Sequence, residues 1–149
     1  MLRFFALGPA VLFLVLGLAV VACGDDDDDD DGGGAATGTT VKTTLSDFKI
    51  DLASTSGPAG SFTFELTNNG PEEHEFVIFK TDLAADKLPV TDDKVPEETE
   101  GLNLIDEEEG IPKGESRTLT VDLEAGKYVL ICNLLTHYGQ GMHAAFTVN

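Results

Sequence analysis

The sequence predicts an all-β domain, a Greek-key β-sandwich or barrel, over residues 40–149, and three observations lead to this fold class. Apolar residues alternate with polar ones in short runs rich in β-branched and aromatic side chains, as on half-buried strands. Turns that contain glycine, proline or asparagine separate these runs at short intervals. The segment has the length of one ordinary domain, and about seven or eight short strands in that length fit two packed sheets.

Residues 1–22 are expected to be an export signal rather than part of this domain. Arg3 precedes an uncharged apolar run over residues 4–22, and Cys23 follows directly. The segment resembles a bacterial lipoprotein signal peptide, which implies cleavage before Cys23 and lipidation of that cysteine. An uncleaved membrane helix is the alternative, because 19 apolar residues just suffice to span a bilayer. Both interpretations place the domain outside the cytoplasm, and a lipidated Cys23 anchors it to a bacterial cell membrane, on the periplasmic or the outer face.

Residues 23–39 are expected to form a disordered linker after the lipidated cysteine. Residues 25–31 are all aspartate and three glycines follow, so this stretch has no apolar surface to bury and serves as a spacer. The whole chain has 9 basic and 27 acidic residues, and the domain alone keeps 8 and 20 of them. Such a negative surface argues against nucleic acid as a partner and is typical of a protein with basic protein partners or of one whose charge serves solubility alone.

The expected strands follow one another along the domain. In residues 74–80, Phe76 and Ile78 share one face of a strand while Val77 and Phe79 share the other, because side chains alternate along a strand. By the same criteria, the expected strands are residues 41–52 (one strand or two), 61–67, 74–80, 116–123, 127–132 and 143–149.

Residues 82–115 interrupt this pattern, because they are rich in acidic residues and proline. Within them, residues 83–88 are expected to form one helical turn and residues 101–105 one strand. The rest is expected to be surface loop.

A thiol, an imidazole and a thioether occur close together in residues 132–143, which read CNLLTHYGQGMH. Cys132 ends the expected strand 127–132 on its inward face, and His137 and Met142 lie on the loop that follows. Soft sulfur ligands together with imidazole select a soft or borderline metal, and copper first among them. His74 is the candidate fourth ligand, because it opens a strand directly after a turn. Taken singly, each residue has a structural alternative, such as a buried cysteine or a core methionine.

The pattern Cys132-x4-His137-x4-Met142, with His74 upstream, resembles the type 1 copper site of the cupredoxin family, to which plastocyanin and azurin belong. The loop spacing is similar to that of auracyanin and rusticyanin, and the resemblance covers about residues 40–149. It implies one copper ion with His74, Cys132 and His137 in the plane and Met142 as a weak axial ligand.

Two positions depart from the family pattern. Many relatives have Pro-Gly before the loop histidine, where this chain has Leu135 and Thr136. Relatives often have asparagine after the first histidine, and its contacts tie the two ligand loops together, whereas this chain has Glu75. Groups that surround the ligands orient them and tune the metal, so these substitutions bear on loop rigidity and potential.

Together with the signal segment, the resemblance implies a membrane-tethered type 1 copper protein that carries single electrons between extracytoplasmic redox partners, as a monomer. Because this ligand set leaves no open coordination position, no catalysis of its own is expected. Around the exposed edge of His137, an apolar docking patch is expected from Leu134, Leu135 and Tyr138, with plain packing of the loop as the alternative for the leucines. The acidic surface is expected to steer a basic partner to it. His143 is expected to face solvent or its strand neighbours, with a transient ligand role as the alternative. Extracytoplasmic copper storage, or delivery of copper to an oxidase, is the alternative function, and a purely structural use of the fold is a third reading.

Overall fold

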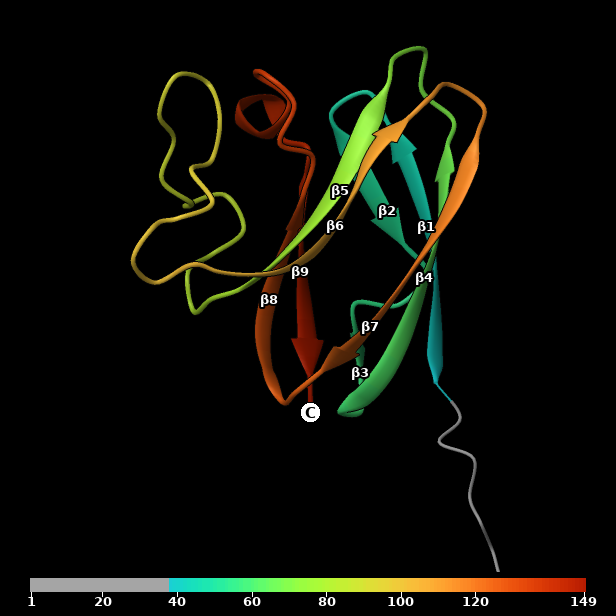
Figure 1. The fold of residues 1–149 in the computed structure, drawn as a ribbon, viewed down its shortest axis with the longest axis vertical. Coiled ribbons are helices and arrows are strands. Elements are labelled where there is room, and N and C mark those ends of the chain that lie inside the picture. Colours follow the sequence, from blue (N-terminus) through green and yellow to red (C-terminus); the bar gives the residue numbers. More distant parts are fainter. Residues whose placement is uncertain (1–37) are drawn as a thin grey trace, which may run out of the picture. The chain divides into compact units, whose positions relative to one another are not determined.

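Residues 38–149 are described by a computed structural model, in which they form two β-sheets packed face to face (Figure 1). The strand order is β2-β1-β4-β7 in the four-stranded sheet and β3-β9-β8-β5-β6 in the five-stranded sheet. The strands are β1 (Thr39–Ser46), β2 (Lys49–Leu52), β3 (Ser56–Gly57), β4 (Gly60–Asn68), β5 (His74–Lys80), β6 (Asn103–Ile111), β7 (Ser116–Leu123), β8 (Gly126–Ile131) and β9 (His143–Val148), with one 3-10 turn, η1 (Tyr138–Gln140).

The connections between strands make this a Greek-key sandwich, as the sequence predicts. The chain crosses from one sheet to the other five times: on either side of β3, between β4 and β5, between β6 and β7, and between β7 and β8. As a result β1 pairs in parallel with β4, and β3 in parallel with β9, while the remaining pairs are antiparallel. Such an arrangement leaves the turns gathered at the two ends of the sandwich.

Alternation along β5 supplies two separate cores, and this confirms the two faces predicted for it. Phe76 and Ile78 point into the main core between the sheets. The centroids of the Phe76 and Phe64 rings are 5.2 Å apart there. Val77 and Phe79 belong to a second core on the outer face of the five-stranded sheet. Each large side chain in these cores is almost fully buried, and burial of that kind stabilises a fold by about 1.5–3 kcal/mol per residue.

The second core is covered by residues 81–102, here called the 81–102 loop. Leu88, Val95 and Leu102 of this loop pack with the outward side chains of β5 and β8. In Figure 1 this loop (yellow) lies beside the segment that carries η1. It therefore belongs to the packed fold.

The prediction for residues 82–115 is wrong in two places. Residues 83–88 form no helical turn, and the Lys87 N–H donates to the Ala84 carbonyl at 2.9 Å in a single tight turn. The expected strand at residues 101–105 continues to Ile111 as β6, through the acidic residues 106–109. β6 is an edge strand that pairs only with β5, and charged side chains are typical of exposed edges.

The signal segment 1–22, the lipidation site Cys23 and nearly all of the linker 23–39 lie outside the described residues. Within residues 38–149, no helix has both the length and the apolar character needed to cross a membrane.

Candidate metal centre

Strand pairing brings His74 and Cys132 together although 58 positions separate them. His74 is the first residue of β5, and Cys132 directly follows β8. These two strands are antiparallel neighbours in which Val77 pairs with Ile131, so the start of one lies beside the end of the other. The long sequence separation is thus closed by a single strand pair.

Three donor side chains meet at this end of the sandwich. The ligand atoms of His74, Cys132 and His137 all lie within 4.8 Å of one another, and all three residues are buried. The sulfur of Cys132 is 3.4 Å from Nδ1 of His137 and 3.9 Å from Nδ1 of His74. Both imidazoles therefore present Nδ1 to the sulfur, while their Nε2 atoms are left for other contacts.

Met142 lies in the same loop and is completely buried in the main core, together with Cys132. Its backbone is hydrogen-bonded to the backbone of Cys132 and of His137. The Cys132 N–H donates to the Met142 carbonyl, and the Met142 N–H donates to the His137 carbonyl, each at 3.1 Å. The loop is thereby closed into a compact turn around η1. His74, Cys132, His137 and Met142 are arranged as in a type 1 copper site.

Burial determines the protonation states of the donors. Burial raises the pKa of the Cys132 thiol to about 11, against the opposing effect of backbone N–H groups of Glu75 and Leu134. Burial also lowers the pKa of His74, and the neighbouring His137 lowers it further. At neutral pH the donors are therefore a thiol and a neutral imidazole, which bind a metal when the thiol proton leaves. Two nitrogens and two sulfurs fit copper.

The turn before β5 is held in place by a buried asparagine. The Asn68 amide donates to the carbonyls of Glu72 and Ile111, at 2.7 and 2.8 Å, and its side-chain oxygen accepts from the Gly70 N–H at 2.8 Å. Because this side chain donates two hydrogen bonds to backbone carbonyls, it fixes the backbone that positions His74 in the site.

Two carboxylates lie beyond the imidazoles, and the sequence analysis did not identify them. Asp47, from the turn between β1 and β2, places Oδ1 3.5 Å from Nε2 of His74. Glu72, from the turn before β5, places Oε2 3.5 Å from Nε2 of His137. In the sequence, each of them is only an acidic residue in a turn. Such residues are common in turns, so their presence does not indicate a neighbouring metal site.

Glu75 stands where relatives often have asparagine, and it also contacts the loop of residues 132–142, here called the ligand loop. Its backbone N–H donates to the Cys132 sulfur at 3.4 Å. Its side chain is buried, which raises the pKa of its carboxyl, while Lys94 and the backbone N–H of Asn133 act in the opposite direction. The contact with Asn133 ties the strand of the first histidine to the loop of the other donors.

The 81–102 loop holds the outer side of the ligand loop. Asn133 accepts from the Val95 N–H at 2.7 Å and donates to the Val95 carbonyl at 2.9 Å. The Tyr138 hydroxyl donates to the Ala85 carbonyl at 2.9 Å and accepts from the Leu88 N–H at 2.8 Å. A surface loop with no metal ligand of its own thus fixes the segment that carries two of the donors.

Thr136 occupies the position where many relatives have glycine, and its backbone has φ 73°. Left-handed backbone is costly for a β-branched residue and easy for glycine. Here the Thr136 N–H donates to the Asp93 carbonyl at 3.0 Å, so the 81–102 loop also supports this strained residue.

The predicted docking residues differ in exposure. Leu135 is 60% exposed, and Leu134 is half-buried against the main core. Tyr138 departs from the expectation, because its ring is buried in the second core and offers no surface to a partner. His143 is half-buried with its ring 5.3 Å from that of Tyr138, and it is not among the three donors that converge.

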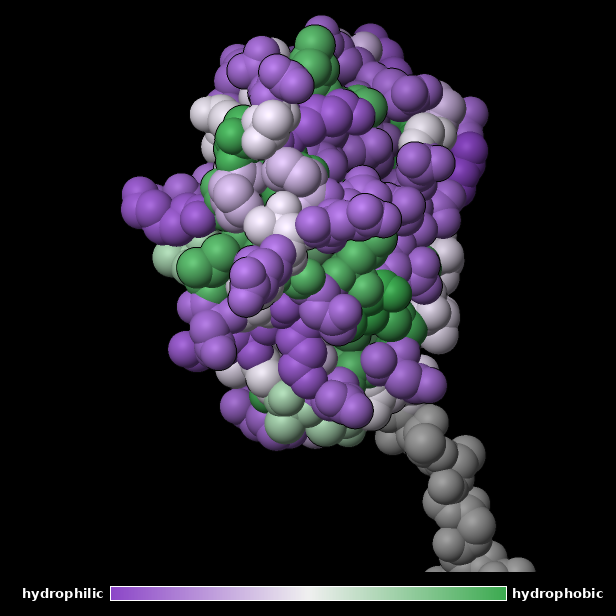
Figure 2. Space-filling model, turned by 60° about the vertical axis from the view of Figure 1, so that its left-hand side comes forward, coloured by the Kyte–Doolittle hydropathy of each residue, from purple (hydrophilic) through white to green (hydrophobic). Residues whose placement is uncertain are grey.

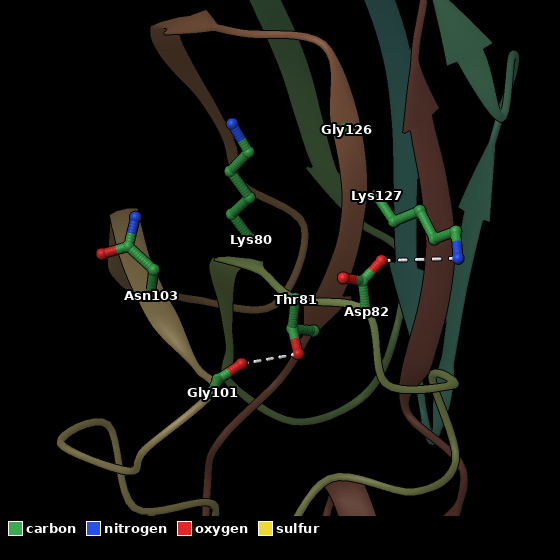
Figure 3. Close-up of a pocket in the computed structure, with 7 residues that line it drawn as sticks. All are labelled: Lys80, Thr81, Asp82, Gly101, Asn103, Gly126 and Lys127. Atoms are coloured by element: carbon green, nitrogen blue, oxygen red, sulfur yellow. Dashed lines mark hydrogen bonds and ion pairs between the residues drawn. The ribbon is translucent and has the colours of Figure 1, made fainter.

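A pocket lies at the other ends of β5 and β8, away from this centre (Figure 3). The Thr81 hydroxyl donates to the Gly101 carbonyl there, and Lys127 pairs with Asp82. Its lining contains neither sulfur nor imidazole: Lys80, Thr81, Asp82, Gly101, Asn103, Gly126 and Lys127. The pocket therefore has no donors for a soft metal.

The fold is similar to that of several solved structures of blue copper proteins. An auracyanin from Roseiflexus castenholzii is 24% identical, with a TM-score of 0.58, over 74% of this chain and 97% of that chain. An azurin from Methylomonas sp. strain J is 17% identical, with a TM-score of 0.54, over 74% and 98%. Rusticyanin from Thiobacillus ferrooxidans is 18% identical, with a TM-score of 0.52, over 76% and 79%.

A search of curated proteins gives no match. The family model described as "Cupredoxin-like domain" matches residues 10–148, which is most of the chain. With the Greek-key sandwich and three buried donors at one end of it, this match shows that the chain belongs to the cupredoxin-like domain family.

Proposed function

We propose that this protein binds one copper ion through His74, Cys132, His137 and Met142 and carries single electrons between redox partners. Cupredoxin relatives are electron-transfer copper proteins. One observation supports the proposal above all: one ring nitrogen from each of two histidines and one sulfur lie within 4.8 Å of one another in a buried site. A nitrogen–sulfur donor set of this composition is typical of copper electron-transfer sites.

A copper ion held there supplies one-electron chemistry by alternating between its two common oxidation states. The chain contributes a donor geometry that stays constant while the charge changes. The ligand loop is held at Cys132 by the backbone N–H of Glu75, and at Asn133 and Tyr138 by hydrogen bonds to the 81–102 loop. Since little atomic rearrangement is needed, the barrier to electron transfer is small. All four donors are committed to the ion, so we assign the protein no catalysis of its own.

Electrons leave and enter through the edge of His137, which is 8% exposed and is the donor nearest to solvent. Leu135, at 60% exposure on the same loop, provides apolar contact area for a partner. Figure 2 shows one face of the molecule, on which hydrophilic residues predominate. Because the domain is strongly acidic, we propose a basic docking surface on the partner, which gives fast and salt-sensitive association.

The proposed location is outside the cytoplasm, on the periplasmic or the outer face of a bacterial cell membrane, with lipidated Cys23 as the anchor. The aspartate-rich residues 25–31 then form a spacer between the membrane and β1, which begins at Thr39. The like charges of this spacer repel one another and anionic lipid headgroups.

Copper storage or delivery is the second candidate, and the burial of the donors argues against it. A protein that hands over its ion needs donors that an acceptor can reach, whereas His74 and Cys132 are fully buried and His137 nearly so.

The test is to add copper(II) to the purified protein and record its visible spectrum and its voltammogram. Electron carriage requires an intense sulfur-to-copper absorption, loss of that absorption in Cys132→Ser, and reversible one-electron redox. The matched control is His143→Ala, which is expected to keep the colour. A colourless protein contradicts the copper site, and a coloured protein that releases copper to a chelator within seconds favours delivery.

A further inference from the structure

We propose that Asp47 and Glu72, which lie outside the donor set, lower the reduction potential of the metal by facing the outer nitrogens of the two histidines. The inference rests on the proposed copper function and goes beyond it, because it assigns two further residues a role in setting the potential.

The case is strongest for Asp47 and His74. Nε2 of His74 is buried, and within the described residues it has no hydrogen-bond partner. The atom that faces it is Oδ1 of Asp47, at 3.5 Å. A buried ring nitrogen of this kind needs a polar neighbour, and metal-binding histidines characteristically turn their second nitrogen to a carboxylate, a carbonyl or a water.

Gly70 makes room for this pair. A Cβ atom at this position would lie 2.7 Å from Nε2 of His74 and 2.9 Å from Oδ1 of Asp47. Both distances are shorter than real Cβ contacts, so any larger residue would push the imidazole and the carboxylate away. The absent side chain at position 70 is what lets the two groups face each other.

The turn that carries Asp47 is built around the site. Ser46 pairs with Lys49, so Asp47 and Phe48 alone connect β1 to β2. Phe48 has φ 60°, a left-handed conformation that is rare for an aromatic residue and is typically kept where function needs it. Its ring meets the His137 ring edge-on, with centroids 5.5 Å apart. This two-residue turn therefore reaches both imidazoles, with a carboxylate for one and an aromatic ring for the other.

Glu72 plays the same part for His137 from the neighbouring turn. Its Oε2 lies 3.5 Å from Nε2 of His137. Its backbone carbonyl is held by the Asn68 amide at 2.7 Å, so the base of the side chain is fixed. The side chain of Glu72 is 60% exposed, against 35% for Asp47, and solvent screens it more.

The direction of the effect follows from charge. With Nδ1 directed to the metal, Nε2 carries the hydrogen, and a carboxylate beside it makes the imidazole a stronger electron donor. A stronger donor and a nearby negative charge both favour the more positive oxidation state of the ion. The reduced state of the metal is therefore disfavoured, and its reduction potential falls. Burial and the weak Met142 ligand act in the opposite direction and raise the reduction potential.

The experiment compares the reduction potentials of copper-loaded wild type, Asp47→Asn, Glu72→Gln and the control Glu73→Gln. All three variants lose one negative charge, but Glu73 has no contact with either imidazole among the described interactions. We expect the potential to rise most in Asp47→Asn, less in Glu72→Gln and least in the control. Equal shifts in all three variants, or no shift in Asp47→Asn, would overturn the inference.

A second readout does not depend on redox. In the zinc-loaded protein, the Nε2 proton of His74 is observed by NMR, and its resonance moves upfield in Asp47→Asn because an amide oxygen is a weaker acceptor than a carboxylate. An unchanged resonance contradicts the contact. If wild type takes up no copper, the proposed function fails. If wild type is coloured and redox-active while the potentials do not separate, only this inference fails.

Discussion

At the scale of single residues, the donors are held by neighbours that have no metal-binding chemistry of their own. Asn68 fixes the turn before His74 with three hydrogen bonds, and Gly70 leaves space beside the imidazole. Glu75 donates its backbone N–H to the Cys132 sulfur. The precision of the site therefore depends on positions that a search for His, Cys and Met does not reveal.

Gly70→Ala tests the space beside His74. The added methyl group would come within 2.7 Å of Nε2 of that residue, so we expect the free energy of unfolding of the metal-free protein to fall by about 1–3 kcal/mol, as is typical of overpacking. Urea denaturation measures it. The control is Gly139→Ala, where a Cβ meets nothing within 4 Å and the change is expected to stay within about 0.5 kcal/mol. Equal losses in the two variants would contradict the steric argument.

Copper affinity is predicted to increase with pH, because the pKa of the Cys132 thiol is raised to about 11 by burial. The thiol holds its proton at every pH below that value, and the metal binds the thiolate, so each binding event releases one proton. The apparent affinity therefore rises up to about tenfold per pH unit between pH 6 and 9. Competition with a chelator of known protonation measures this slope, and an affinity independent of pH would show that the thiolate is already formed.

At the scale of elements, the 81–102 loop is the feature of greatest consequence for the site. It covers the second core, and it bonds to the ligand loop through Asn133, Thr136 and Tyr138. The ligand loop thus lies between the main core on one side and this loop on the other. Packing and hydrogen bonds from a distant segment thus hold the ligand loop in place.

Asn133→Ala tests this support. It leaves the Val95 N–H and carbonyl without partners, and a buried unsatisfied polar group costs about 1–3 kcal/mol. We expect a lower free energy of unfolding and faster hydrogen exchange of the Val95 amide. Asn133→Asp keeps the acceptor for the Val95 N–H and loses only the donor, so an intermediate effect is expected. If exchange at Val95 is the same in both variants and in wild type, the loop is not held at this point.

The elements with clean alternation were predictable, and those shaped by long-range contacts were not. β5 shows its two faces in sequence because Phe76 and Val77 point to different cores. The predicted strand ends before the acidic residues 106–109, because their composition is typical of a loop. Only their pairing with β5 makes them part of β6. The sequence also does not reveal that Val95 meets Asn133, because nothing local distinguishes that pair from any other.

The site was predictable in its donors and not in its surroundings. Residues 132–142 carry three donors at a specific spacing, and His74 followed from its place at the start of a strand. Asp47 and Tyr138 gave no such signal. Their roles arise from turns and cores that are far apart in the sequence, so local pattern contains no information about them.

At the scale of the whole molecule, negative charge dominates. The domain holds 20 acidic residues against 8 basic ones, and two acidic side chains stand beside the donors. A field of this sign attracts cationic redox partners and repels anionic ones over distances comparable with the Debye length, about 8–10 Å near physiological salt. The charge of the molecule thus selects the class of partner, while the metal centre sets the chemistry.

Electron exchange with small complexes tests this field. Reduction of the copper-loaded protein by hexaammineruthenium(II) is expected to slow with added salt, on the order of tenfold between low and high ionic strength, because screening removes an attraction. Oxidation of the reduced protein by ferricyanide is expected to speed up, because screening removes a repulsion. Stopped-flow measurements at several salt concentrations give both slopes, and slopes of equal sign would refute electrostatic steering.

The pairing of β5 with β8 has a further consequence, since it lets a single ion bridge positions 74 and 132. Ligand that binds only the folded state stabilises it, by about 4 kcal/mol when free ligand exceeds its dissociation constant a thousandfold. The empty protein should therefore melt first. A brief heat step applied to a partly loaded sample would precipitate the empty molecules and leave the filled ones in solution.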